Sequence, residues 1–200
     1  MTEYGKRYED CTLDNFDASE NPEALEAVRG LIAGHLSGLL LFGPVGTGKT
    51  HLCVGAGRAF AGRGEAYEPE YVYGADGRPT AVKPRPDFSV SYWPVLDLAG
   101  AFRDAAGGGC PSPEPPCRSA GLLILDDWGA ERTTDFVLEA LERIVDARYR
   151  AMKPMLIATN MNPGAIMERY GDRALSRWAH DGRIVELRGR DRRTGGGACR

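Results

Sequence analysis

Residues Gly43 to Thr50 read GPVGTGKT, directly after the apolar run Leu39-Leu40-Leu41-Phe42, and a helix-compatible stretch from His51 to Ala61 follows. Glycine, four residues and Gly-Lys-Thr between a strand and a helix is the pattern of a phosphate-binding loop, in which backbone N–H groups turn towards a phosphate. The helix presents its positive N-terminal dipole to the same anion. These residues therefore predict a nucleoside-triphosphate site.

The side chains at the end of this loop carry two further expectations. Lys49 is expected to reach the β- and γ-phosphates of ATP, and the Thr50 hydroxyl to ligate Mg²⁺. The predicted nucleotide-binding residues of the loop are Gly43, Pro44, Val45, Gly46, Thr47, Gly48, Lys49, Thr50 and His51.

Two carboxylates follow a second apolar run. Leu122-Leu123-Ile124-Leu125 is typical of a strand buried on both faces of a parallel sheet, and Asp126 and Asp127 come directly after it. Ligands of open α/β sheets bind at the carboxyl ends of the strands. We expect Asp126 to hold the magnesium ion through water, and Asp127 to orient and polarise the water that attacks the γ-phosphate.

A third apolar run, Met155 to Thr159, ends in Asn160. If its strand is parallel to the others, Asn160 lies at the same edge of the sheet and can reach the γ-phosphate or the attacking water. An amide suits that place because it both donates and accepts hydrogen bonds, and so fixes water without adding charge. Lys49, Asp127 and Asn160 are the catalytic residues predicted from these three motifs.

Strands alternate with helices along most of the chain. Apolar spacing and capping signals predict helices over 22–35, 51–61, 94–106, 134–150, 163–170 and 172–180. Asn21 is the expected N-terminal cap of the first helix. Strands are predicted over 39–42, 88–92, 122–125, 155–159 and 183–187. This alternation predicts an α/β fold: a P-loop three-layer sandwich with a mostly parallel five-stranded sheet and helices on both faces.

Breaker residues interrupt the pattern twice. In residues 63–87, two short β-prone pieces flank an Asp-Gly turn, which predicts a small hairpin inserted into the core. Residues 107–117 are predicted to form a proline-rich loop. The expected organisation is a lead-in segment with a helix (1–42), an ATPase core (43–193) and a flexible tail (194–200).

Composition narrows the functional classes. The chain has 200 residues and a net charge of −3, so nucleic-acid binding would have to come from a local patch. Six arginines between 183 and 200, and the aromatic residues Tyr92, Trp93 and Trp128, could supply such a patch for single-stranded DNA. Equally, Tyr92 and Trp93 could be sheet residues, and the arginines could only keep an edge soluble.

Cysteine usage and hydropathy suggest a cytoplasmic protein. The five cysteines are odd in number and lack C-x-x-C spacing, which favours thiols, although Cys110 and Cys117 could pair across their proline-rich loop. The N-terminus carries no leader-like apolar segment, and no apolar run approaches a membrane span. We therefore expect no membrane partner.

The motifs GPVGTGKTHL, LLILDDWGAERTTDF, KPMLIATN, YGDRALSR and GRDRR occur in the order and spacing of the DnaC/DnaI-type helicase-loader ATPases of the AAA+ class. The chain also resembles the transposon helper ATPases of the IstB type. The resemblance spans nearly the whole chain outside the two breaker-rich stretches, and residues 6–17 are similar to the segment that precedes the P-loop in these proteins.

The resemblance implies further residues and partners. Arg173 matches the arginine finger that enters a neighbouring subunit's site, and Arg177, one helical turn further on, matches a supporting position. Arg193 matches the second sensor arginine, which contacts phosphate within its own subunit. The implied partners are ATP with Mg²⁺, further copies of the chain, and a replicative helicase or another DNA-bound protein. The helical lid of most AAA+ proteins is expected to be absent or rudimentary.

Several functions fit these motifs. A loader or remodeller that acts by ATP-dependent assembly on a DNA-bound partner is the leading hypothesis, and a transposition helper is its nearest alternative. A small-molecule kinase would need an acceptor pocket, whereas Asp127 and Asn160 suit water as the nucleophile. A nucleotide-dependent binding module that hardly turns over is the last alternative, because Asp127 is shorter than the glutamate of many AAA+ enzymes.

Overall fold

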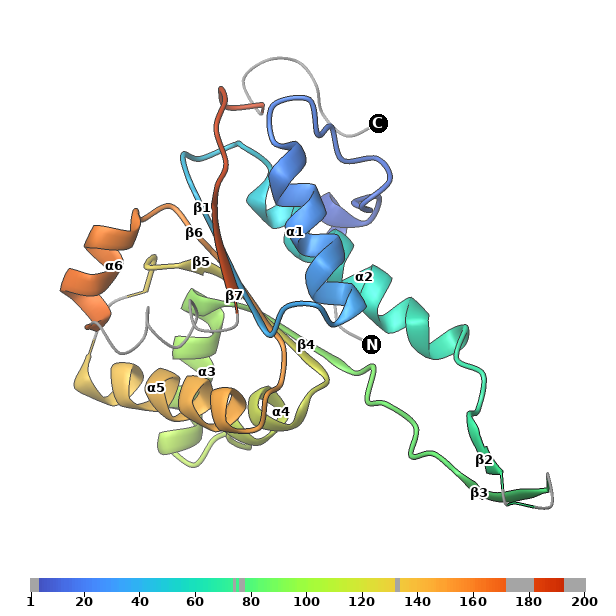
Figure 1. Ribbon diagram of the computed structural model, residues 1–200. Coiled ribbons are helices and arrows are strands. Elements are labelled where there is room, and N and C mark those ends of the chain that lie inside the picture. Colours follow the sequence, from blue (N-terminus) through green and yellow to red (C-terminus); the bar gives the residue numbers. More distant parts are fainter. Residues whose placement is uncertain (1–3, 74, 76–77, 132–133, 172–181, 193–200) are drawn as a thin grey trace.

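The predicted strands form one parallel sheet in the computed structural model, which describes residues 4–73, 75, 78–131, 134–171 and 182–192. The strands are β1 (Gly38–Phe42), β4 (Val90–Pro94), β5 (Leu122–Trp128), β6 (Met155–Thr159) and β7 (Gly182–Glu186). Their order across the sheet is β4-β5-β6-β1-β7, and every neighbouring pair is parallel (Figure 1). The carboxyl ends of β1, β5 and β6 therefore meet at one edge, as the motifs require.

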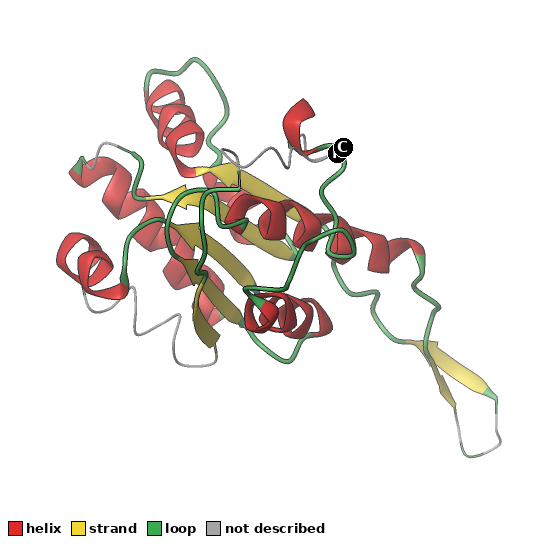
Figure 2. Ribbon diagram, turned by 90° about the horizontal axis from the view of Figure 1, so that it is seen from above, coloured by secondary structure: helices red, strands yellow, loops and turns green. Residues whose placement is uncertain are grey.

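Helices cover both faces of the sheet (Figure 2). They are α1 (Pro22–Ala33), α2 (Lys49–Glu65), α3 (Val95–Ala106), α4 (Glu114–Ser119), α5 (Asp135–Arg150) and α6 (Pro163–Tyr170), with a 3₁₀ turn at Lys6–Tyr8. Alternate strand residues face opposite layers: Leu39 and Leu41 pack with α1 and α2, whereas Leu40 packs with α3 and α5. The predicted three-layer α/β sandwich is confirmed.

Two details of the sequence reading need correction. The stretch 107–117 is not loop throughout, because α4 begins at Glu114, and its two prolines at 115 and 116 lie in the first turn, where a missing N–H costs no helical bond. Asn21 does precede α1, but its side chain makes no capping bond. Instead, the Asn21 amide exchanges two hydrogen bonds with the backbone of Arg188, donating at 2.9 Å and accepting at 2.8 Å.

The predicted hairpin is present and projects from the body of the molecule (Figures 1 and 2). Strands β2 (Tyr71–Tyr73) and β3 (Pro79–Val82) pair antiparallel. Aromatic contacts fix the base of the hairpin. The Phe88 ring packs edge-on against Phe60, and the Arg63 guanidinium lies 5.3 Å from the centre of the Phe88 ring. Within the described residues, Lys83 and Glu70 form an ion pair of 2.6 Å across the hairpin.

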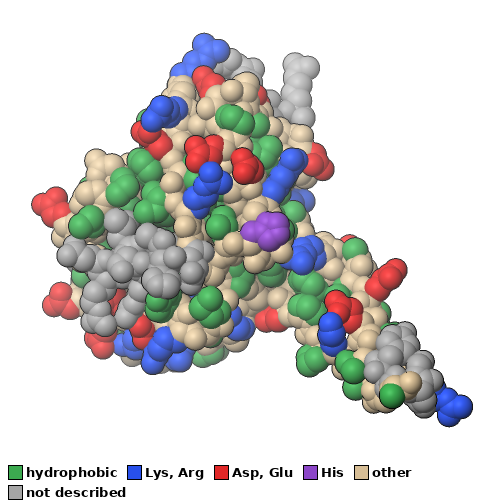
Figure 3. All heavy atoms as spheres, in the orientation of Figure 1, with side chains coloured by type: hydrophobic (Ala, Val, Ile, Leu, Met, Phe, Trp, Pro, Cys, Tyr) green, Lys and Arg blue, Asp and Glu red, His purple; other side chains and the backbone are tan. Residues whose placement is uncertain are grey.

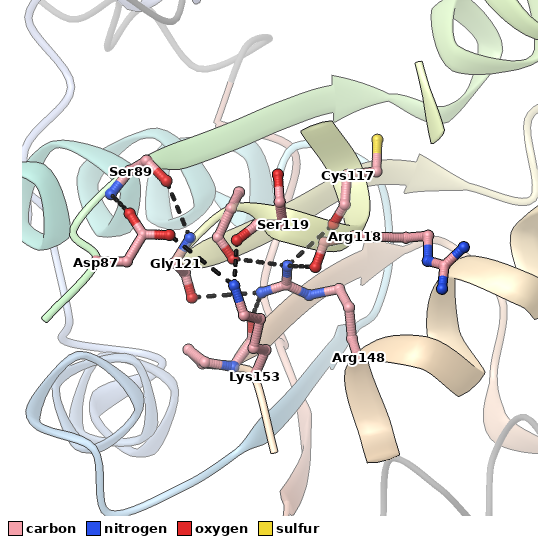
Figure 4. A network of polar contacts seen from close by, with 10 residues as sticks. Asp87, Ser89, Cys117, Arg118, Ser119, Gly121, Arg148 and Lys153 are labelled. Atoms are coloured by element: carbon pink, nitrogen blue, oxygen red, sulfur yellow. Dashed lines mark hydrogen bonds and ion pairs between the residues drawn. The ribbon is translucent and has the colours of Figure 1, made fainter. Parts of the chain in front are cut away.

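A buried arginine joins α5 to the amino-terminal ends of β5 and β6 (Figure 4). Arg148 is fully buried, and its guanidinium donates to five carbonyl groups, at Cys117, Arg118, Ala120, Gly121 and Pro154. Burial lowers the pKa of Arg148 to about 10, so the side chain stays charged at neutral pH. This network lies at the sheet edge opposite the predicted site.

Candidate nucleotide-binding site

The GPVGTGKT loop runs from β1 into α2, as predicted. Gly48 has φ 101°, a conformation that favours glycine, and it directly precedes the first residue of α2. A Cβ at Gly48 would also lie 2.8 Å from the Phe16 ring of the lead-in segment. Glycine at this position therefore serves both the turn of the loop and the close approach of residues before β1.

Lys49 is held inside the loop. Its ammonium group donates to the carbonyl oxygens of Gly43 at 2.9 Å and Pro44 at 2.7 Å, and its side chain is almost fully buried. The Thr47 hydroxyl donates to the same Pro44 carbonyl at 3.0 Å. A cation buried in a ring of backbone groups is suited to meet a phosphate, which would give it a full charge partner in place of two carbonyl dipoles.

Asp126 lies at the end of β5, where it is only 3% exposed. One of its oxygens accepts the Tyr92 hydroxyl at 2.9 Å, the other accepts the Asp127 N–H at 2.9 Å, and the Thr50 hydroxyl also hydrogen-bonds to the carboxylate. Burial, and then the charge of Asp127, raise the pKa of Asp126, while these hydrogen bonds oppose the rise. The two predicted metal-binding side chains, Thr50 and Asp126, are therefore in contact.

This donor set fits magnesium. Mg²⁺ prefers oxygen ligands, keeps several waters, and is commonly bound by one or two carboxylates together with substrate phosphates. Within the described residues, no group of three or more His, Cys, Asp or Glu side chains forms an alternative metal centre. The assignment of Thr50 and Asp126 as magnesium ligands stays a prediction that their geometry allows.

Asp127 is exposed and has an unusual backbone conformation. Its φ is 53°, in the left-handed region that non-glycine residues rarely adopt, and the pairing of β5 with β6 shifts register between Leu125 and Trp128. The irregularity turns the Asp127 side chain out of the ladder at the ligand edge of the sheet. Such strained residues gather at functional sites, which agrees with the predicted role of Asp127 in orienting water.

Asn160 is exposed and directly follows β6, which is the strand next to β5. Its neighbour Thr159 is fully buried, donates its hydroxyl to the Trp128 carbonyl at 2.5 Å and accepts the Met161 N–H at 3.0 Å. These bonds join the carboxyl ends of the two strands. Asp127 and Asn160 therefore stand at adjoining strand ends, and their catalytic roles stay predictions.

The His51 side chain faces the lead-in segment. Its Nε2 atom lies 2.8 Å from the Thr12 carbonyl and 2.9 Å from the Asn15 Oδ1 atom, and its ring packs edge-on against Phe16. Burial lowers the pKa of His51, so the neutral ring is favoured. The sequence reading placed His51 with the nucleotide-binding residues; its ring joins the P-loop helix to residues 12–16, and contact with nucleotide stays a prediction.

The chain after β7 also lies against the P-loop, a contact that the sequence did not reveal. Leu187 N–H donates to the Phe42 carbonyl at 2.7 Å, and Arg192 N–H donates to the Gly46 carbonyl at 3.2 Å. Asp191 is so close to Gly46 that a Cβ there would overlap its carboxylate. The Arg192 side chain donates to the Asp17 carbonyl at 2.9 Å, so the P-loop lies between the lead-in segment and the chain after β7.

Known proteins share this fold. The replication initiator DnaA bound to AMPPCP and single-stranded DNA has a TM-score of 0.71 and 25% identity, covering 93% of this chain and 52% of that chain. The DnaC helicase loader has a TM-score of 0.68 and 20% identity, and the match covers 92% of this chain and 100% of that chain. DnaI has a TM-score of 0.70 and 18% identity, and the match covers 94% of this chain and 93% of that chain. The chain has the fold of an AAA+ P-loop ATPase.

One curated protein is similar to this chain in sequence. It is named as an ATP-binding protein in an insertion sequence of Mycobacterium tuberculosis, and is 28% identical over 160 residues. The match covers 76% of this chain but 54% of that protein, so the chain spans about half the length of the relative. No protein-family model matches the chain. The predicted resemblance to loader and transposon-type ATPases is confirmed.

The structure weighs against the aromatic residues as a stacking surface for single-stranded DNA. Trp128 is 3% exposed and packs edge-on against Tyr170, Tyr92 is bound to Asp126, and the Trp93 Nε1–H donates to Ser91. They belong to the sheet and its core, which for Tyr92 and Trp93 was the alternative left open.

Charges give no better support for a basic patch in the described part of the chain. Arg183 pairs with Glu23, Arg188 with Glu186, and Arg192 with Glu20. On the face shown in Figure 3, acidic and basic side chains are interspersed. The predicted roles of Arg173, Arg177 and Arg193 fall on residues outside those that the structure describes.

The described cysteines, Cys110 and Cys117 among them, form no disulfide, and burial raises the pKa of the Cys117 thiol to about 11. None of the helices in the described ranges combines the length and the apolar character that crossing a bilayer requires.

Proposed function

We propose that the protein binds ATP with Mg²⁺ in the GPVGTGKT loop and hydrolyses it to ADP and phosphate. The observation that carries this proposal is the contact between Thr50, at the start of α2, and the buried Asp126 at the end of β5. Two residues 76 positions apart in the sequence thus bring a hydroxyl and a carboxylate together at the start of the P-loop helix. AMPPCP in the DnaA relative and the ATP-binding name of the curated relative support ATP as the ligand.

The side chains divide the work of hydrolysis. Magnesium, held by Thr50 and by Asp126 through water, would supply charge neutralisation on the phosphates. Lys49 binds the β- and γ-phosphates, Asp127 orients the attacking water, and Asn160 fixes that water or the γ-phosphate. Each of these groups acts by position and charge, which is how most phosphoryl-transfer sites work.

The resemblance supplies a role for assembly. We propose that Arg173 of one subunit completes the site of its neighbour, and that Arg193 contacts phosphate within its own subunit. ATP would then favour assembled subunits and hydrolysis would release them. Such coupling needs ATP and ADP to differ in affinity for the assembled and separated states.

The partner proposed for this assembly is a DNA-bound protein, most simply a replicative helicase, as for the DnaC helicase loader. A transposition helper is the second candidate, because the curated relative belongs to an insertion sequence. In either case DNA is contacted by the partner, or by residues of this chain other than Tyr92, Trp93 and Trp128.

ATP hydrolysis by the purified protein, measured against protein concentration with and without single-stranded DNA, tests the proposal. A turnover number that rises with concentration is expected, because the site is shared between subunits. Lys49→Ala should remove nucleotide binding and serves as the negative control. A wild-type protein that binds no ATP would overturn the proposal. A turnover number that does not change with protein concentration would agree with hydrolysis but would contradict a site shared between subunits.

Mixing two inactive variants tests the finger. Asp127→Asn should bind ATP but stall, and Arg173→Ala should bind ATP but lose assembly-dependent hydrolysis. In a mixture, an intact finger from the first variant meets an intact water-orienting site of the second, so activity should return. If no mixing ratio restores hydrolysis, Arg173 is not the finger.

A further inference from the structure

A buried carboxylate lies just after the two aspartates of β5. The Glu131 side chain has no exposed surface, and one of its oxygens accepts the Gly129 N–H at 2.9 Å. The other accepts the Tyr170 hydroxyl and lies 3.5 Å from the Arg169 guanidinium. Glu131, Arg169 and Tyr170, here called the Glu131 cluster, therefore bind the carboxyl end of α6 to the loop that follows β5.

Arg169 strengthens this connection through the backbone. Its guanidinium donates to the Gly129 carbonyl at 3.0 Å and to the Glu131 carbonyl. The Tyr170 ring packs edge-on against Trp128, with 5.1 Å between ring centres. Within four residues of Asp127, the last two residues of α6 thus contact two carbonyls, a carboxylate and an aromatic ring.

The loop fixed in this way adjoins Asp127 on its carboxyl side. Asp127 is in the left-handed region with φ 53°, and Gly129 follows with φ 101°. Strained backbone of this kind persists only where the surroundings hold it. The Glu131 cluster is the support on the carboxyl side of Asp127, while the Thr159 hydroxyl holds the Trp128 carbonyl from β6.

Stability alone does not explain a buried charge here. Replacing a buried ion pair by well-packed apolar side chains is often neutral or stabilising, so such pairs are weak sources of stability. On its outer side the cluster borders a hollow of about 430 Å³ between α5 and α6, lined by Leu138, Val145, Arg169 and Tyr170 among others. Among the described residues, this hollow borders the end of α6 on the side facing α5.

We propose that the Glu131 cluster positions Asp127 according to the placement of the end of α6. This inference rests on the proposed function, in which Asp127 orients the attacking water. Arg173, the proposed finger, lies three residues after Tyr170 in the sequence. When the finger of one subunit enters the site of its neighbour, it therefore affects the end of α6 in its own subunit, which holds Asp127. Hydrolysis in the subunit that supplies the finger then depends on contact with the neighbour. Glu131, Arg169 and Tyr170 are positioning residues in this scheme, since they act through Asp127.

Glu131→Gln tests the proposal, because the amide keeps the size of the side chain but removes its charge. ATP affinity should stay within about twofold, while kcat should fall about tenfold, the effect of losing one charge-assisted hydrogen bond. The dependence of rate on protein concentration should flatten. Hydrogen exchange at the Gly129 amide should become faster, a readout independent of activity. Arg169→Met should match Glu131→Gln, and the double variant should be little worse than either, whereas Arg169→Lys should recover part of kcat.

Arg148→Met is the matched control. Arg148 is a buried arginine that also binds backbone carbonyls, but it lies at the opposite edge of the sheet. At a temperature where all variants are folded, it should keep the wild-type kcat and concentration dependence. The proposal is overturned if Glu131→Gln keeps both as well, or if Arg148→Met loses them to the same extent. A wild-type protein without ATPase activity would instead refute the proposed function.

Discussion

The Tyr92 hydroxyl in β4 donates a hydrogen bond of 2.9 Å to the Oδ2 atom of Asp126 in the neighbouring strand β5. Burial, and then the charge of Asp126, raise the pKa of Tyr92, so the phenol stays protonated and remains a donor at neutral pH. Because Asp126 is the proposed magnesium carboxylate, Tyr92 is placed to orient it. The Tyr92 ring also packs edge-on against Tyr4, with ring centres 5.1 Å apart.

Tyr92→Phe removes this hydroxyl and leaves the ring in place. Loss of an outer partner of a metal ligand typically costs about 10- to 100-fold in metal affinity, and we expect the lower end of that range for magnesium. The measurement is ATP binding titrated with Mg²⁺, with ATP binding in EDTA as the metal-free reference. Trp93→Phe is the control, since Trp93 donates to Ser91 and not to Asp126. An unchanged magnesium requirement in Tyr92→Phe would show that Asp126 needs no support from β4.

The sequence predicted the fold and the centre of the site because both rest on local signals. A continuous apolar run identifies β5, and glycine spacing identifies the loop before Thr50. The contacts of Tyr92 and Glu131 were missed because they depend on tertiary structure. The register between β4 and β5 sets the contact of Tyr92, and the loop after β5 sets the contact of Glu131. Tyr92 meets Asp126 only when β4 pairs with β5, and Glu131 meets Tyr170 across 39 residues. A tyrosine in a strand and a glutamate after Gly-Ala carry no signal of these partners.

Two predictions were wrong because they were made from local sequence alone. Proline-rich sequence at 113–116 indicated a loop, yet prolines are tolerated in a helical first turn, and α4 is helical. Trp128 was considered as an aromatic residue available for stacking on single-stranded DNA, but it is a strand residue whose side chain enters the core. The register shift between Leu125 and Trp128 breaks the alternation along β5 and places Trp128 on the same side as Leu123 and Leu125, which the sequence does not indicate.

Arg148→Met should destabilise the fold strongly. The substitution removes the guanidinium that donates to five carbonyls, three of them in buried hydrogen bonds, and we expect a loss of about 3 kcal/mol in the free energy of unfolding. In a chain of this size the melting temperature should fall by roughly 6 to 12 °C. Thermal unfolding followed by circular dichroism measures both.

Arg150→Ala is the comparison for that experiment. Arg150 lies two residues further on in α5, is exposed, and pairs with Asp146 at 2.8 Å one turn earlier. An exposed pair of this kind contributes about 0.5 kcal/mol at most. If both variants lost equal stability, the carbonyl network of Arg148 would not be the cause.

Acidification should weaken the fold through His51. Burial lowers the pKa of His51 in the folded protein below its unfolded value of 6.5. Between the two values the unfolded chain binds a proton that the folded chain does not, so stability falls as pH drops below about 6.5. His51→Gln can still donate to the Thr12 carbonyl but does not titrate. The difference in melting temperature between wild type and His51→Gln should therefore change between pH 7.5 and 5.5, with the wild type losing more. A constant difference would mean that His51 is as readily protonated in the folded state.

Two glycines of α2 should respond oppositely to alanine. A Cβ at Gly55 would lie 2.9 Å from the Leu13 Cδ2 atom and 3.0 Å from the backbone of the lead-in segment, whereas a Cβ at Gly62 would meet nothing within 4 Å. Gly62→Ala should therefore raise the free energy of unfolding by up to about 1 kcal/mol, from helix propensity alone. Gly55→Ala gains the same propensity but overpacks a buried contact, which typically costs about 1–3 kcal/mol, so the net change should be a loss.

Proteolysis separates local from global effects in the same pair. In Gly55→Ala the lead-in segment is pushed from α2, so trypsin should cut after Lys6 and Arg7 faster than in the wild type, while Gly62→Ala should be cut at the wild-type rate. Because Phe16 of this segment packs against Gly48 of the P-loop, ATP affinity should fall in Gly55→Ala as well. Faster cleavage with unchanged ATP affinity would show that the lead-in segment covers α2 without supporting the nucleotide loop.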